Sequence, residues 1–366
     1  MTEINWFEVS NKEGLRSTPA LLVYPDRIMR NIQLMIELAD GVEKLRPHIK
    51  THKSADIIKL QLERGITKFK CATIPEAELL AKSGAKDVLL AMQPVGPNIL
   101  RFFDLMKKYP ASNFSTLVDN QKSVADIAAM AEEEGVNASV WLDINNGMNR
   151  TGVVPSEALP LFQSMVDEPR LSIQGLHVYD GHIHDEDLVM RTNACEEDFE
   201  PVESLRQEIA KYGMMLPKVI AGGTPTFALH KKRKNVELSP GTPLLWDAGY
   251  GEHFPDLPFE NAAVLATRIV SLPTPNLICL DLGYKAVASE MELPRVKFLG
   301  GHDFEVMGHN EEHMVVRTND RHGHQIGDLF YALPIHICPT VVRYDQLLKV
   351  KGNEYVGSWP VATRSH

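Results

Sequence analysis

Apolar and polar positions alternate in two regular ways along the first two thirds of the chain. Short apolar runs indicate buried strands, and the longer segments between them place apolar residues three and four positions apart, as amphipathic helices do. Repeated strand and helix favour parallel strands joined by right-handed crossovers. The eight predicted strands are LRPHIKTH (45–52), KFKCATI (68–74), DVLLAM (87–92), NFSTLVD (113–119), ASVWLDI (138–144), LSIQGLHVY (171–179), KVIAGG (218–223) and NVELSPG (235–241). Eight such units within residues 15–245 predict an α/β fold, a (β/α)8 barrel of the TIM type.

The pattern changes after about Trp246. Segments such as NLICLDLG and HMVVRTND are short, rich in β-branched residues and separated by turn residues, with little sign of a long helix. Residues 246–366 are therefore predicted to form an all-β domain. Residues 1–14 precede the first predicted helix and could add a strand to that domain.

Composition narrows the possible partners. The 366 residues are 44% hydrophobic and carry a formal net charge of -10, with a pI near 5.8. Nucleic acid demands a basic surface, so a small-molecule partner is expected instead. No apolar run is long enough to span a bilayer, and the N-terminus lacks the layout of a signal peptide, which predicts a cytoplasmic protein without a membrane partner.

The segment LRPHIKTH contains a candidate catalytic lysine. If residues 45–52 form a strand, His48, Lys50 and His52 share one face. A lysine inside a barrel loses hydration, which favours the neutral amine that Schiff-base chemistry needs. The alternative is a lysine at a strand end that reaches solvent.

A second candidate site is AGGTPTF (221–227), which follows the seventh predicted strand. Thr224 suits a helix N-cap, and Gly222 and Gly223 would let the backbone approach a ligand. Barrels often bind phosphate at this position, where a helix N-terminus offers free N–H groups. The same residues are also common in plain turns.

A third candidate is PIHICPT (334–340). His336 and Cys338 are two apart in a segment that resembles a strand, so imidazole and thiolate would face the same way, with Pro339 holding Cys338 extended. That pair suits zinc or a similar metal, with coordination positions left open for catalysis. A lone His-x-Cys is nevertheless more often accidental than metal-binding.

Two further residues lie beyond predicted strands, at the end of the barrel where active sites are found. Arg150 in NNGMNRTGV (145–153) could reach the barrel mouth, although a solvent-facing arginine is the alternative. Tyr179 ends the sixth strand, in HVYDGHIH (177–184), whose three histidines offer a competing metal site.

Taken together, RPHIKTHK, NRTGV, GGTPTF and HICPT, in this order and over nearly the whole chain, resemble the D-threonine aldolase and D-serine dehydratase family. These are fold-type III pyridoxal-phosphate (PLP) enzymes related to alanine racemase. The resemblance implies that Lys50, and not Lys53, carries PLP. It also implies that Gly222, Gly223 and Thr224 bind the cofactor phosphate and that Tyr179 and Arg150 lie close to the cofactor ring. His52 would handle substrate protons. His336 and Cys338 would hold a divalent metal, zinc or manganese.

The resemblance implies a lyase that acts on a D-β-hydroxy amino acid, by elimination of water or by retro-aldol cleavage. Within the family, His-x-Cys tends to accompany dehydratases, so Cys338 favours elimination. The alternatives are a racemase, which would leave the metal pair idle, and a non-catalytic PLP-binding protein. A homodimer is expected on family grounds. Glu312 and His313 receive no role and are read as an exposed polar turn.

Overall fold

The computed structural model describes residues 5–11, 14–211, 215–319 and 323–365, which form two compact units. The barrel unit comprises Met35–Lys50 and Ile57–Gly241, with Ser365–His366. The β unit comprises Met1–Leu34, Thr51–Asp56 and Thr242–Arg364. The two units are described separately.

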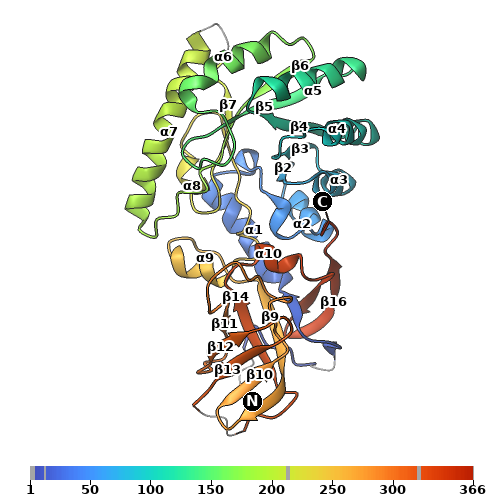
Figure 1. Cartoon of the computed structure of the whole chain (residues 1–366), viewed down its shortest axis with the longest axis vertical. Helices are drawn as coiled ribbons and strands as arrows, with labels where there is room; N and C mark the ends of the chain where they lie inside the picture. Colours follow the sequence, from blue (N-terminus) through green and yellow to red (C-terminus); the bar gives the residue numbers. More distant parts are fainter. Residues whose placement is uncertain (1–4, 12–13, 212–214, 320–322, 366) are drawn as a thin grey trace. The chain divides into compact units, whose positions relative to one another are not determined.

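The barrel unit is built on a parallel sheet in which consecutive strands are neighbours (Figure 1). Every pairing along it is parallel, as the strand and helix alternation predicted. The seven strands are β2 (Lys68–Cys71), β3 (Asp87–Leu90), β4 (Asn113–Val118), β5 (Ala138–Ile144), β6 (Leu171–Val178), β7 (Lys218–Ala221) and β8 (Val236–Leu238).

The first predicted strand, residues 45–52, is only partly a strand. Leu45 bridges Leu238 of β8 and His48 bridges Lys70 of β2, both in parallel, so this segment joins the two edges of the sheet at the eighth position. After His48 the chain turns into the 3-10 helix η3 (Ile49–Thr51). The barrel prediction is confirmed, but the strand ends at least two residues before Lys50.

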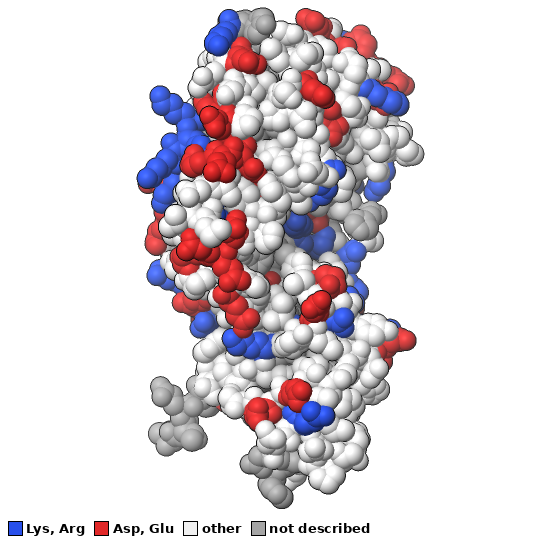
Figure 2. All heavy atoms as spheres, turned by 60° about the vertical axis from the view of Figure 1, so that its left-hand side comes forward, with Lys and Arg blue, Asp and Glu red and all other residues white. Residues whose placement is uncertain are grey.

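Helices alternate with the strands along the chain, and some of them begin at a side chain that caps the helix. They are α1 (Pro25–Ala39), α2 (Ala55–Glu63), α3 (Ile74–Lys82), α4 (Pro97–Lys108), α5 (Gln121–Glu133), α6 (Pro155–Val166), α7 (Leu188–Lys211) and α8 (Phe227–His230). The Thr73 side chain caps α3 and the Asn120 side chain caps α5, each accepting from a backbone N–H three residues later. In Figure 2 acidic and basic side chains are interspersed over the visible face. On α7, Glu196, Glu197 and Glu200 are exposed.

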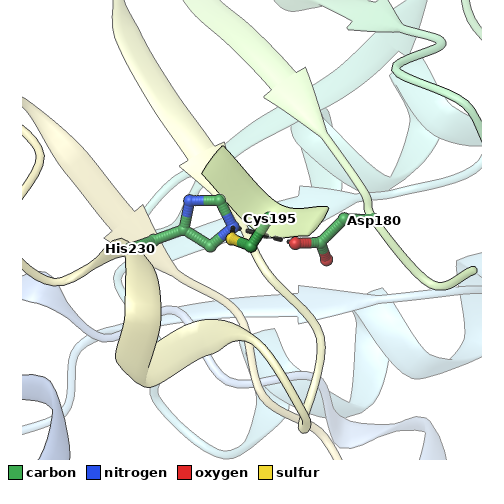
Figure 3. A group of neighbouring side chains, drawn as sticks. All are labelled: Asp180, Cys195 and His230. Atoms are coloured by element: carbon green, nitrogen blue, oxygen red, sulfur yellow. Dashed lines mark hydrogen bonds and ion pairs between the residues drawn. The ribbon is translucent and has the colours of Figure 1, made fainter. Parts of the chain in front are cut away.

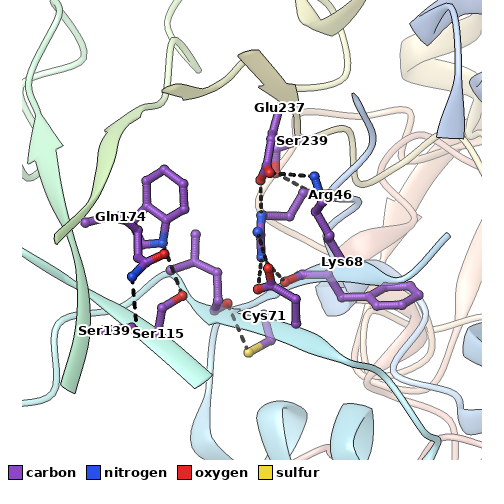
Figure 4. A network of polar contacts seen from close by, with 12 residues as sticks. Arg46, Lys68, Cys71, Ser115, Ser139, Gln174, Glu237 and Ser239 are labelled. Atoms are coloured by element: carbon purple, nitrogen blue, oxygen red, sulfur yellow. Dashed lines mark hydrogen bonds and ion pairs between the residues drawn. The ribbon is translucent and has the colours of Figure 1, made fainter. Parts of the chain in front are cut away.

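A buried ionic network fills the barrel at the N-terminal ends of its strands (Figure 4). Arg46 is 1% exposed and donates to Glu237 at 2.6 Å and to Asp87 at 2.7 and 2.9 Å. Lys68 donates to the second oxygen of Glu237 at 2.6 Å. Because each buried charge has a partner of opposite sign, this end of the barrel is a packed ionic core.

The β unit is organised around a sheet of nine described strands. They are β1 (Ala20–Val23), β9 (Ala263–Thr274), β10 (Leu277–Leu280), β11 (Val296–Phe298), β12 (Glu305–His309), β13 (Met314–Arg317), β14 (Leu329–Pro334), β15 (Gln346–Lys351) and β16 (Glu354–Pro360). All pairings are antiparallel except that of β1 with β15. Two short helices, α9 (Ala248–His253) and α10 (Cys338–Val341), interrupt the strands.

The strand suggested for residues 1–14 is not found where the structure describes that segment. Residues 1–4 and 12–13 lie outside the described residues, and residues 5–11 form turns. Phe7 and Val9 nevertheless pack into the hydrophobic core of the β unit, beside Tyr331 and Leu333 of β14. The N-terminal strand of this sheet is β1, residues 20–23.

Candidate active site

The structure corrects the predicted shared face of His48, Lys50 and His52. Side chains alternate with a period of two only in a strand, and η3 replaces that period by about three residues per turn. Lys50 is exposed, so the loss of hydration predicted for a lysine inside the barrel is not found and the alternative of a lysine that reaches solvent holds for this position. His52, by contrast, is fully buried and belongs to the β unit. The backbone N–H of Lys50 donates to Nδ1 of His48 at 3.1 Å.

His52 is held in its neutral form. Burial, followed by the charge of Lys53, lowers the pKa of His52 from 6.5 to about 3. The backbone N–H of Ser54 donates to Nδ1 of His52 at 3.2 Å, so this nitrogen is the acceptor and the proton lies on Nε2.

Several groups lie close to the ring of Tyr179, which follows β6 directly, at the C-terminal ends of the strands. The Arg150 guanidinium lies 5.0 Å from the ring centroid, so Arg150 does reach the barrel mouth. The amine of Lys70 lies 5.4 Å from the same centroid. Lys70 was not among the predicted site residues, although a lysine between the apolar residues of KFKC was a visible signal.

Two more residues at this end were missed by the sequence analysis. Asp143 of β5 and His177 of β6 are paired in register, and Nδ1 of His177 lies 2.6 Å from Oδ1 of Asp143. The carboxylate fixes the proton on Nδ1, and the buried Nε2 has no hydrogen-bond partner among the described residues. Burial lowers the pKa of His177, so its ring presents a neutral acceptor nitrogen.

The loop after β7 requires a glycine at position 222. Gly222 has φ of 80°, and a Cβ there would lie 2.7 Å from the backbone Cα of Phe227. A Cβ on Gly223 would lie 3.1 Å from the Tyr179 ring, a tight contact that a small shift of the ring would relieve. The backbone of this loop therefore passes directly beside Tyr179.

Thr224 does not cap a helix, contrary to the prediction. Helix α8 begins only at Phe227, with Thr226 at its N-cap position, and it spans a single turn. Residues 224–226 form a turn instead, and the Thr224 hydroxyl accepts from the backbone N–H of Gly241 at 3.2 Å. The preceding strand ends at Ala221, which leaves room for this turn before the helix.

Asp180, Cys195 and His230 form a buried cluster that anchors this loop (Figure 3). Oδ1 of Asp180 accepts from the Gly223 N–H at 3.1 Å and from the Thr226 hydroxyl at 2.8 Å. Oδ2 of Asp180 lies 2.8 Å from Nε2 of His230, and Sγ of Cys195 lies 3.3 Å from the same nitrogen. Asp180 therefore ties the end of β6 to the glycine loop.

The same three side chains lie close enough to share a metal ion, but the tautomer of His230 argues against one. Arg233 donates from Nε to Nδ1 of His230 at 3.0 Å, and a guanidinium can only donate. The imidazole proton is therefore on Nε2, which donates to Asp180. A metal would have to displace that proton and break the bonds that anchor the loop.

The three histidines of HVYDGHIH do not converge on a metal site. His177 pairs with Asp143, and Nε2 of His182 lies 2.5 Å from Asp198 on α7. His184 is exposed and contacts the backbone oxygen of His182. The competing metal site is therefore absent from this described segment.

In the β unit, His336 and Cys338 do meet, though not by strand alternation. β14 ends at Pro334, and Cys338 is the first residue of α10, with Pro339 in the first helical turn rather than holding an extended strand. The two side chains are hydrogen-bonded to each other. Nδ1 of His336 lies 2.6 Å from Oε1 of Glu290, which leaves Nε2 as the ring nitrogen able to bind a metal.

The surroundings of this pair define what it can bind. Sγ of Cys338 lies 3.1 Å from the Thr51 hydroxyl and 3.6 Å from the Thr242 hydroxyl. Asp247 is close to His336, but its oxygens accept from the backbone N–H groups of Ile337 and Tyr250. Imidazole and thiolate together suit zinc or a similar borderline metal.

Most of the barrel unit matches a known protein family. The model of the alanine racemase N-terminal domain matches residues 23–246, more than half of the chain. The chain belongs to this family. A second model, described as "Putative serine dehydratase domain", matches residues 262–350.

Relatives and solved structures of this family extend over nearly the whole chain. The 3-hydroxy-D-aspartate aldolase of Paracoccus denitrificans is 28% identical over 361 residues, covering 95% of this chain and 92% of the relative. The D-threonine aldolase of Arthrobacter sp is 26% identical, with the same coverage. A crystal structure of D-threonine aldolase from Filomicrobium marinum is 26% identical, has a TM-score of 0.84 and covers 95% of this chain and 96% of that one. The family resemblance expected from the sequence is confirmed.

Proposed function

We propose that this chain is a lyase that uses PLP and a divalent metal to cleave or dehydrate a D-β-hydroxy amino acid. The observation that carries the proposal is a match that covers 75% to 95% of this chain, over both units, to enzymes named as aldolases and dehydratases of such substrates. The racemases among the sequence relatives match 52% of the chain or less. A solved alanine racemase covers 94% of this chain but at 14% identity, so it shares the fold alone, and the sequence matches favour the lyase over the racemase.

The barrel unit contains residues that fit PLP. Gly222 and Gly223 form a loop that excludes a side chain at position 222, the Tyr179 ring adjoins it, and two lysine amines lie at the same end of the sheet. Lys50 would carry the cofactor, Gly222, Gly223 and Thr224 would bind its phosphate, and Tyr179 and Arg150 would contact its ring. When bound, PLP acts as an electron sink for charge that develops at the substrate Cα.

The β unit contains residues that fit a divalent metal. His336 and Cys338 would be the protein ligands, and two ligands leave positions for the substrate. A bound metal would polarise the substrate's β-hydroxyl. His52, which is neutral with its proton on Nε2, stays our proposed residue for handling substrate protons, with Lys50 as the base at Cα.

Two outcomes follow from which proton is removed. Loss of the hydroxyl proton breaks the Cα–Cβ bond and releases an aldehyde, and protonation of Cα then gives glycine. Loss of the Cα proton, with departure of the hydroxyl as water, gives an enamine, which tautomerises to an imine that water hydrolyses to a keto acid and ammonia. We favour elimination because Cys338 stands where the family's aldolases tend to carry aspartate.

One assay tests this proposal. The protein, loaded with PLP and with zinc or manganese, is incubated with D-serine, D-threonine and 3-hydroxy-D-aspartate, with the L-enantiomers as controls, and aldehyde and ammonia are measured. We expect ammonia from D-substrates only. Protein that turns yellow with the cofactor but consumes no D-substrate would be a non-catalytic PLP-binding protein.

Assembly and location are proposed on family grounds. We propose a homodimer, a cytoplasmic location and a division of labour between a cofactor domain, residues 15–245, and a metal domain, residues 246–366 with 1–14. Within the part of the chain that the structure describes, no helix is long and apolar enough to cross a membrane.

A further inference from the structure

Lys70 is a buried lysine whose charge is not balanced by a close carboxylate. Lys70, on β2, is 3% exposed, and its backbone N–H donates to the Pro47 oxygen at 2.9 Å. Among the described residues no carboxylate lies within ion-pair distance of its amine, which lies 5.4 Å from the centroid of the Tyr179 ring. Burying a cation without a partner is unfavourable, so this residue needs an explanation.

Neighbouring charges act on the Lys70 amine in both directions. The charges of Lys50 and Arg150 act against protonation of its amine, and those of Asp143 and Asp180 favour it. Both aspartates are already engaged, Asp143 by His177 and Asp180 by His230, Thr226 and Gly223. Burial, followed by the charge of Lys50, lowers the pKa of the Lys70 amine from 10.5 to about 7.

The location of Lys70 connects it to the cofactor loop. Tyr179 adjoins Gly223 on one part of its ring and has the Lys70 amine and the Arg150 guanidinium near its centroid. The bridge between His48 and Lys70 also places this residue on the strand beside the segment that leads into Lys50. Lys70 is thus bordered by residues of the proposed PLP site.

We propose that Lys70 is a further cofactor-binding residue, whose amine supplies positive charge to the ring of PLP beside Tyr179. The inference rests on the proposed function. The phenolic oxygen of the PLP ring is anionic near neutral pH, and a buried ammonium group is a strong hydrogen-bond donor to such an oxygen. Lys50 is consumed by its covalent link to the cofactor, so a second amine is needed to provide this charge.

A structural role and a cofactor role predict opposite effects of removing the amine. A structural lysine stabilises the folded protein with or without PLP. A cofactor-binding lysine destabilises the cofactor-free folded protein, because its amine is buried without an anion, and it stabilises the fold only when PLP is bound. Lys70→Met keeps the length and removes the charge, which separates the two roles.

The test uses the full-length protein without cofactor, as wild type, Lys70→Met, Lys70→Gln and Lys70→Arg. Lys86→Met is the matched control, because Lys86 is exposed and carries the same charge. Affinities for PLP and for pyridoxal, which lacks the phosphate, are measured by absorbance titration. Thermal unfolding of each cofactor-free variant is measured in parallel.

We expect Lys70→Met and Lys70→Gln to bind PLP and pyridoxal at least about tenfold more weakly, the loss typical of one charged hydrogen bond. Cofactor-free Lys70→Met should unfold at a higher temperature than wild type, and Lys70→Arg and Lys86→Met should keep cofactor affinity. If Lys70→Met binds both ligands as tightly as Lys86→Met, the inference is wrong. A loss for PLP alone would also overturn it, because Lys70 would then hold the phosphate.

Failure of the proposed function has a different signature. If wild-type protein binds neither PLP nor pyridoxal, the proposed cofactor site as a whole is wrong. If wild-type protein binds PLP and Lys70→Met and Lys70→Gln bind it as tightly as the control does, only the proposed role of Lys70 is wrong.

Discussion

Oε1 of Glu290 lies 2.6 Å from Nδ1 of His336. A carboxylate at this position fixes the proton on Nδ1, orients the ring and turns Nε2 toward the metal-binding side, an arrangement that recurs behind metal-binding histidines. Neither residue type nor spacing in ASEMELP indicated this pairing, because Glu290 lies in a loop far from His336 in sequence.

We predict that Glu290→Gln weakens zinc binding about 10- to 100-fold, the usual effect of removing such a carboxylate. Competition with a chromophoric chelator measures the affinity directly, without any assay of activity. Glu292→Gln is the control, because Glu292 is exposed and two residues away. Equal affinities in the two variants would show that Glu290 does not orient a metal ligand.

Gly222→Ala should disturb the cofactor loop. The new Cβ would lie 2.7 Å from a backbone atom of Phe227, which cannot move aside as a side chain can, so the loop must shift. Gly84→Ala is the control: Gly84 also has a positive φ, of 96°, but open space around it. Both changes should cost about 1–2 kcal/mol of backbone strain, and we expect only Gly222→Ala to weaken PLP binding in titrations.

Glu237→Gln should destabilise the barrel without altering the site. It removes the carboxylate charge that Arg46 and Lys68 share at the opposite ends of the strands. A buried charge left wholly unpaired costs about 3–5 kcal/mol, and the loss here should be smaller because Arg46 keeps its two hydrogen bonds to Asp87. Urea unfolding of the barrel should show the loss, while the affinity for PLP of the folded fraction stays at the wild-type value.

The stability of the cofactor-free protein should depend on pH through Lys70. Its pKa falls from 10.5 to about 7 on folding, so folding releases a proton between these values. The contribution of Lys70 therefore lowers the free energy of unfolding most below pH 7, and this effect disappears as the pH rises through 10.5. Lys70→Met should therefore be more stable than wild type at neutral pH, with a difference that shrinks toward pH 10.5. A constant difference across this range, measured by denaturant unfolding, would mean that Lys70 does not titrate in this way.

The sequence predicted the parallel barrel well because its strands are buried apolar runs. β2 to β8 lie within the predicted segments, since each is bounded by a capping or turn residue that the sequence makes visible. The failures occur where the chain leaves regular structure. Residues 49–51 form a 3-10 turn, and Thr224 enters a turn before α8, and in both places hydrogen bonds to distant residues set the geometry.

The candidate site was predictable where a motif concentrates it in sequence, as at Gly222, Gly223, His336 and Cys338. It was not predictable where the barrel assembles it. Asp143 and His177 meet only because β5 and β6 pair in one register, and Asp180 reaches the glycine loop only because β6 and β7 are neighbours. Long-range pairing of this kind leaves no local pattern to read.

The central claim is that Lys50 carries the cofactor, and the nearby amine of Lys70 makes a direct measurement necessary. The protein loaded with PLP is reduced with borohydride, which makes the lysine link permanent, and the modified peptide is located by mass spectrometry. We predict that the pyridoxyl group is on Lys50, within RPHIKTHK. Modification of Lys70 instead, or of no lysine in the barrel unit, would contradict the account.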